Sequence, residues 1–134
     1  MARLTVDTSA VLETFDTGAP RFGEVTAVLE DEEHPPFVPA TVLCEIGYLA
    51  EHRYGKGALD RVLAELEGGA LKLDCGERDI GRVRGLLERY DDLRLGSADA
   101  FVIACAERNG KRVLTLDRRH FDVVGRELGL DVLP

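Results

Sequence analysis

Cysteine is scarce in this chain and shows no pairing pattern. The three cysteines, Cys44, Cys75 and Cys105, are an odd number and form no CxxC pair. A disulfide framework needs cysteines in even numbers, and a cysteine-based zinc site uses close pairs. We therefore expect reduced, mostly buried thiols and neither of these two classes of protein.

Long hydrophobic runs are also missing. No apolar stretch approaches the roughly 18 residues of a membrane span. The N-terminal sequence MARLTVDTSAV lacks the apolar core and cleavage site of a signal peptide. We expect a cytoplasmic protein with no membrane partner. Its length of 134 residues, 45% of them hydrophobic, suits one globular domain over residues 1–134.

Positive charge is in deficit. The net charge is −8 at pH 7, which argues against loose, charge-driven binding to nucleic acid. The deficit is uneven, because residues 1–77 carry 6 Lys/Arg against 15 Asp/Glu, whereas residues 78–134 carry 11 against 10. Global charge is a poor guide, however, if several acids gather in one site where a metal neutralises them.

Common nucleotide and hydrolase motifs are absent. The chain has no GxGxxG, no GxxxxGK[ST] and no GxSxG, so a dinucleotide site, a P-loop and a nucleophile elbow are not indicated. A haloacid-dehalogenase-type phosphatase would need an acid two residues after Asp7, where this chain has Ser9. The acid pair and late lysine of a response-regulator receiver domain are also unclear.

Short apolar strands alternate with amphipathic helices along the chain. Strands are predicted at 3–6, 37–38, 70–74, 112–116 and 130–134. Helices are predicted at 10–15, 22–29, 40–54, 57–67, 78–90 and from about 97, and residues 118–121 are expected on a short turn. This alternation predicts an α/β fold: a three-layer α/β/α sandwich around a central parallel sheet of four to five strands.

The helix that opens near Ser97 is predicted to be the most enclosed. Asp99 precedes seven small or apolar residues, 100–106, and a helix that is apolar all round is usually buried. Asp99 then lies in the first turn, where free amides and the helix dipole favour an anion. One interpretation is a capping role, with Ser97 as the cap and Asp99 inside the first turn.

Three further acids are expected at the same edge of the sheet. Asp7 and Asp117 each follow a predicted strand, and Glu45 lies about one turn into the helix after the second strand. Four carboxylates in one cleft repel each other, and a hard divalent cation such as Mg²⁺ removes the conflict. Zinc is disfavoured because no His or Cys shows a ligand spacing near these acids. His120, near the cleft, is interpreted as structural.

Four motifs together resemble those of PIN-domain proteins, and most closely the VapC-type toxins of bacterial toxin–antitoxin pairs. They are VDTSAVL (6–12), PATVLCEIGYL (39–49), LGSADAFVIACAERNG (95–110) and TLDRRHF (115–121). The resemblance covers nearly the whole chain. It implies a Mg²⁺- or Mn²⁺-dependent endoribonuclease that acts as a toxin, forms a homodimer and is silenced by a cognate antitoxin.

The resemblance also implies roles for particular residues. The catalytic, metal-binding acids would be Asp7, Glu45, Asp99 and Asp117. Thr115 and Ser97 would support them with hydrogen bonds, and Asp92 is a candidate fifth acid. Because the chain is acidic, an RNA-binding surface would have to be built locally, for which the candidates are Arg82, Arg89, Arg118 and Arg119.

Two alternatives remain open from the sequence. The first is a non-catalytic binding module of the PIN fold, which the acidic net charge favours. The second is a metal-dependent nuclease or phosphatase that acts on other substrates, because the fold and the acids do not separate RNA from DNA.

Overall fold

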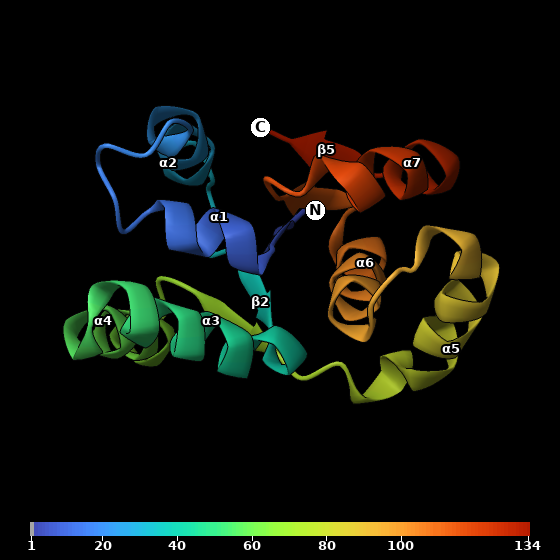
Figure 1. Cartoon of the computed structure of the whole chain (residues 1–134), viewed down its shortest axis with the longest axis horizontal. Coiled ribbons are helices and arrows are strands. Elements are labelled where there is room, and N and C mark those ends of the chain that lie inside the picture. The colour runs from blue at the N-terminus through green and yellow to red at the C-terminus, as the bar shows by residue number, and fades with distance from the viewer. Residues whose placement is uncertain (1) are drawn as a thin grey trace.

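A five-stranded parallel sheet forms the centre of the protein (Figure 1). The structure is a computed structural model that describes residues 2–134. The sheet order is β3-β2-β1-β4-β5, and every neighbouring pair is parallel. The strands are β1 (Leu4–Val6), β2 (Phe37–Pro39), β3 (Lys72–Asp74), β4 (Arg112–Leu114) and β5 (Asp131–Leu133).

Helices cover both faces of the sheet, which confirms the predicted three-layer sandwich. Figure 1 shows α1 to α4 on one side and α5 to α7 on the other. The helices are α1 (Thr8–Glu13), α2 (Phe22–Glu30), α3 (Ala40–Tyr54), α4 (Lys56–Gly68), α5 (Ile80–Arg89), α6 (Ser97–Asn109) and α7 (Arg118–Leu128), with 3₁₀ turns η1 (Glu77–Asp79) and η2 (Asp91–Leu93). None of the helices within residues 2–134 has the length and apolar character needed to cross a membrane.

The strand order places a topological switch point between β1 and β4. The chain leaves β1 toward β2 on one side and leaves β4 toward β5 on the other. The two strands pair in register, with Val6 opposite Leu114. In open α/β sheets, ligands bind in the crevice at the carboxyl ends of the strands at such a point. The residues that follow Val6 and Leu114 therefore occupy the position where a site is expected.

Helix α6 is the most enclosed element, as its sequence predicts. Ala100 and residues 102–106 are at most 1% exposed, and α6 contacts β1, β2 and β4. Asp99 lies in the first turn of this helix. The predicted Ser97 cap is wrong: Gly96 is the N-cap residue, and Ser97 is already the first residue of the helix. A residue inside the helix has its side chain beside the first turn and not over its free amides.

The opposite end of α6 is fixed to the rest of the fold. The Arg108 guanidinium donates to Asp79 at 2.7 Å and 2.8 Å and to Asp74, at the end of β3, at 2.6 Å. The Asn109 carbonyl accepts a hydrogen bond of 2.8 Å from the backbone N–H of Arg3 at the start of β1. We call these contacts the α6 anchor. The anchor holds the helix against both β1 and β3.

One predicted element is wrong. Residues 118–121 form no isolated turn, because they begin the 11-residue helix α7, which ends at the left-handed Gly129. The cause is an apolar stripe beyond the expected turn. Phe121 and Val124 are fully buried and Leu128 packs against the same core, at helical spacing. The charged residues between them conceal this stripe in the sequence.

The turn after α6 provides a test of how tightly the helix is anchored. Gly110 has φ +138°, and an added Cβ would lie 2.5 Å from the Cα of Ala2 and 2.6 Å from the nitrogen of Arg3. We expect Gly110→Ala to lower the free energy of unfolding by about 2 kcal/mol or more, because backbone and not a flexible side chain must move. Urea denaturation measures the change.

Gly85→Ala is the matched control. Gly85 is exposed inside α5 and nothing lies within 4 Å of a Cβ added there. Alanine should therefore stabilise the protein by about 0.5–1 kcal/mol through helix propensity. Equal effects of the two substitutions would contradict the close approach of Gly110 to the first strand.

Candidate active site

One cavity at the carboxyl edge of the sheet brings the four predicted acids together. It has a volume of about 250 Å³, and its acidic lining residues are Asp7, Glu45, Asp99 and Asp117. Asp7 follows β1 and is the N-cap residue of α1, and Asp117 is the N-cap residue of α7. The strand ends, and the helices that follow them, thus bring acids from four distant parts of the sequence to one place.

Asp7 is the most buried of the four acids, with 6% of its surface exposed. Its Oδ2 accepts hydrogen bonds from the hydroxyls of Thr115 at 2.7 Å and Ser9 at 3.2 Å. Burial is the largest influence on this carboxyl and raises its pKa, while the bond from Thr115 opposes the rise. Thr115 follows β4 and Ser9 lies in α1, so the fold fixes both residues. Their hydroxyl groups therefore hold the Asp7 carboxylate in position.

Thr115 links two of the acids. Its fully buried hydroxyl donates to Asp7 and accepts a 3.0 Å bond from the backbone N–H of Asp117. Ser9 plays a parallel part, because its hydroxyl accepts a 2.9 Å bond from the N–H of Leu116. Hydrogen bonds therefore connect the side chains that follow β1 to the backbone that follows β4, in addition to the backbone hydrogen bonds between the two strands.

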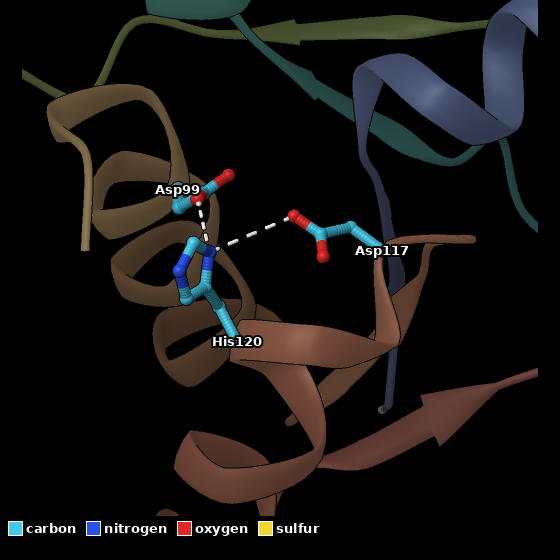
Figure 2. Close-up of side chains that lie close together, drawn as sticks. All are labelled: Asp99, Asp117 and His120. Atoms are coloured by element: carbon cyan, nitrogen blue, oxygen red, sulfur yellow. Dashed lines mark ion pairs between the residues drawn. The ribbon is translucent and has the colours of Figure 1, made fainter. Parts of the chain in front are cut away.

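Asp99, Asp117 and His120 form a compact cluster (Figure 2). His120 Nδ1 lies 3.2 Å from Asp99 Oδ2 and 3.7 Å from Asp117 Oδ2. One ligand atom from each residue can be chosen so that all lie within 4.8 Å of one another. Burial first, and then the charges of Asp7 and Asp117, raise the pKa of Asp99 to about 6. The cluster therefore concentrates negative charge in a partly desolvated place.

Glu45 differs from the other three acids because it is exposed. It lies on α3 together with Leu49 and Arg53, which also line the cavity. These three residues follow one another at intervals of four, so they share one face of the helix. Glu45 and Arg53 thus face the same space with opposite charges.

Two predicted supporting residues are not brought into the cavity. Ser97 is exposed at the start of α6, and Asp92 is exposed in η2; neither lines the cavity. The predicted arginine surface is largely engaged elsewhere. Arg82 pairs with Glu107, Arg89 with Glu127 and Arg118 with Asp122.

Sequence reasoning passed over three residues that the structure places at the site. From the sequence, Ser9 and Arg53 are assigned no role at the site, and His120 is interpreted as structural. A spacing argument could have found Arg53, because it follows Glu45 by eight residues on one helix face. Ser9 and His120 depend on side-chain contacts between distant segments, which the sequence alone does not reveal.

The cluster of Asp99, Asp117 and His120 offers the kinds of donor atom that bind a divalent cation. Carboxylate oxygens suit Mg²⁺ and Mn²⁺, and their crowding is unfavourable without a compensating charge. In addition, the buried Nδ1 of His120 has no hydrogen-bond partner within residues 2–134. A polar atom that is orphaned beside two carboxylates is a place where a positive charge is needed.

The sheet order and the acids at its switch point define an α/β domain that gathers carboxylates at one edge. The chain belongs to the PIN domain family, whose model matches residues 4–127. The predicted resemblance to PIN-domain proteins is therefore confirmed.

Relatives agree with this assignment. Ribonuclease VapC26 of Mycobacterium tuberculosis is 37% identical over 123 residues, which are 90% of this chain and 91% of the relative. The crystal structure of VapC20 of the same organism, a Sarcin-Ricin loop cleaving toxin, has a TM-score of 0.79 at 20% identity and covers 91% of this chain and 95% of that chain. FitAcB from Neisseria gonorrhoeae has a TM-score of 0.65 at 15% identity, covering 98% and 96%. The two structures support the fold.

The raised pKa of Asp99 predicts a pH-dependent stability of the metal-free protein. The folded state holds this proton to about pH 6, whereas an unfolded aspartate releases it near 3.8. The folded state thus binds more protons between these values, and stability falls as the pH rises through them. We expect Asp99→Asn to remove this loss and to be more stable than the wild type at pH 7, by roughly 1 kcal/mol after discounting for solvent screening.

Denaturation in chelator at several pH values between 4 and 7 measures the difference. Asp92→Asn, which removes an exposed carboxylate outside the cavity, is the control and should change stability little at any of them. A gap between wild type and Asp99→Asn that does not widen as the pH rises would contradict the prediction.

Proposed function

We propose that this protein is a metal-dependent endoribonuclease that acts as the toxin of a toxin–antitoxin pair. The observation that carries the proposal is the meeting of Asp7, Glu45, Asp99 and Asp117 around one cavity. The chain that builds this cavity is 37% identical to a protein named as a ribonuclease. The reaction is hydrolysis of a phosphodiester bond in RNA.

The four acids are proposed to hold Mg²⁺ or Mn²⁺. Asp7 provides a ligand whose position is fixed by Thr115 and Ser9, and Asp99 provides one fixed by the burial of α6. Rigid ligands matter because a metal site must keep its geometry during turnover. When bound, the cation neutralises charge on the phosphodiester and makes a coordinated water more acidic. A carboxylate of the site that is not bound to the cation would orient the attacking water and accept one proton from it, and the leaving oxygen would take up a proton from solvent.

Arg53 is proposed to contact the RNA backbone. Among the described residues that line the cavity, it is the one cationic side chain, and residues 2–134 give it no ion pair. An arginine beside a group of carboxylates can bind a phosphate that the acids alone would repel. Arg53 thus lets an acidic protein accept an anionic substrate at this position.

A cognate antitoxin and a second copy of the chain are the proposed protein partners, and the proposed location is the cytoplasm. A toxin of this kind must be silenced in the cell that makes it, which calls for a specific inhibitor protein. Exposed apolar side chains on α3 and α4 support association of two copies. Tyr48 is 69% and Leu63 is 47% exposed, and both line a second cavity.

RNA cleavage that requires a divalent cation is the main test. Purified protein should cut single-stranded RNA with Mg²⁺ or Mn²⁺ and lose this activity in excess chelator. Asp7→Asn and Asp99→Asn should each lower the cleavage rate at least about 100-fold, because each removes a charged ligand. Gel analysis of a labelled RNA oligonucleotide measures the rate.

Asp92→Asn is the control and should cut at close to the wild-type rate. Single-stranded DNA and a phosphomonoester, assayed beside the RNA, separate the proposed activity from other phosphate chemistry. Undiminished RNA cleavage in chelator, or faster hydrolysis of DNA or phosphomonoester than of RNA, would contradict the proposal.

Binding without cleavage tests Arg53. In the Asp99→Asn background, Arg53→Ala should weaken binding of the RNA oligonucleotide by about tenfold and reduce the slope of log affinity against log salt by about 0.7, since one phosphate contact is lost. Fluorescence anisotropy at several salt concentrations measures both quantities. Arg84→Ala removes the same charge from an exposed position on α5 and is the control. Equal effects of the two variants would mean that Arg53 contributes only to the general charge.

A further inference from the structure

His120 stands at the start of α7 with its ring beside two acids of the site. Figure 2 shows Nδ1 facing Asp99, which comes from α6, and Asp117, which precedes α7. The side chain is 15% exposed, so little solvent reaches it. The ring is therefore part of the wall of the acidic cluster, although sequence reasoning gives it only a structural role.

The other ring nitrogen decides which atom carries the proton. His120 Nε2 lies 3.0 Å from the backbone carbonyl of Leu93. A carbonyl oxygen only accepts hydrogen bonds, so Nε2 carries a hydrogen and donates it. In the neutral ring, Nδ1 then has a free lone pair directed toward the cluster. Histidines that bind metals commonly donate their second ring N–H to a backbone carbonyl in this way, which fixes the tautomer and the ring orientation.

The geometry at Nδ1 suits a cation better than a hydrogen bond. Nδ1 is buried 3.2 Å from Asp99 Oδ2, and with the proton on Nε2 the neutral ring has no hydrogen at Nδ1 to donate to that carboxylate. Two lone pairs that face each other at this distance repel, whereas a shared cation holds its ligand atoms at such separations. Neighbouring ligands of an octahedral cation with bonds of about 2.1 Å are separated by about 3 Å. The 3.2 Å and 3.7 Å separations at His120 are close to this value.

We propose that Nδ1 of His120 is a ligand of the cation at this site, beside the carboxylates of Asp99 and Asp117, and that it biases the site toward Mn²⁺ over Mg²⁺. Mg²⁺ is a hard cation that takes oxygen ligands, whereas an imidazole nitrogen gains more from a first-row transition metal. The inference rests on the proposed function only in assuming that a divalent cation binds here. The competing arrangement is a protonated imidazole paired with the two carboxylates and no bond from nitrogen to metal.

Pulsed electron paramagnetic resonance of the Mn²⁺-loaded full-length protein tests the proposal directly. A nitrogen bound to Mn²⁺ gives a ¹⁴N modulation of the electron spin echo. We expect this signal in the wild type and its loss in His120→Gln. The chain has two other histidines, of which His34 is half-buried and His52 is exposed, and His34→Gln and His52→Gln should retain the signal. Wild-type protein with ¹⁵N-labelled histidine should show the corresponding ¹⁵N coupling, which makes the result independent of whether any variant folds.

Metal competition gives a second readout. Titration of Mn²⁺-loaded protein with Mg²⁺ measures the ratio of the two affinities, and His120→Gln should lower the preference for Mn²⁺ by about tenfold. His52→Gln should leave this ratio unchanged. A ratio that is equal in His120→Gln and the wild type would overturn the proposed bias.

The outcomes separate this inference from the proposed function. Bound Mn²⁺ without nitrogen coupling would overturn the inference, and RNA cleavage by the same sample would leave the nuclease proposal standing. Nitrogen coupling that is absent from His120→Gln would support the inference even if no RNA were cut, in which case the proposed function alone would fail. Failure of the wild type to bind Mn²⁺ at millimolar concentration would overturn the inference.

Discussion

The fold must hold the carboxylates of Asp7, Asp99 and Asp117 close together against their mutual repulsion, and the rest of the structure depends on this requirement. Burial makes ionisation of Asp7 and Asp99 less favourable, and the neighbouring negative charges add to this effect, so the pKa values of both carboxyls are raised. A protein free to relax would turn these side chains toward water. Here the hydrogen bond from Thr115 and the enclosure of α6 prevent that relaxation. The surrounding fold therefore stabilises an arrangement that is unfavourable in itself.

Hydrogen bonds between the residues that follow β1 and those that follow β4 hold the carboxylates in this arrangement. Thr115 and Ser9 are not acids and would not bind a cation strongly, yet they connect Asp7 to the backbone after β4. Without these hydrogen bonds, only the local backbone would fix the carboxylates of Asp7 and Asp117, which follow adjacent strands. The site is thus assembled at the switch point between β1 and β4, where the strand pairing and these side-chain hydrogen bonds together hold it in place.

The sequence permits prediction of the sheet, the buried helix and the approximate positions of all four acids. This succeeds because strand ends and helix starts follow from hydrophobic periodicity, and because parallel strands direct their carboxyl ends to one edge. Helix α7 was missed because its apolar stripe is interrupted by charged residues, and the Ser97 cap failed by one position. The contacts of Ser9 and His120 are beyond this reasoning, since they depend on how side chains from distant segments meet.

The α6 anchor has a mechanical consequence for the opposite end of the helix. Asp99 and Asn109 are ten residues apart, which is about 15 Å along a helix axis. A tilt of about 5° at the anchored end would displace Asp99 by about 1.3 Å over that length, and displacements of about 1 Å are enough to impair catalysis. The ion pairs of Arg108 with Asp74 and Asp79 are remote from the cavity, but they fix one end of α6 and so limit the displacement of Asp99 at the other end. The position of Asp99 therefore depends on contacts at the opposite end of α6.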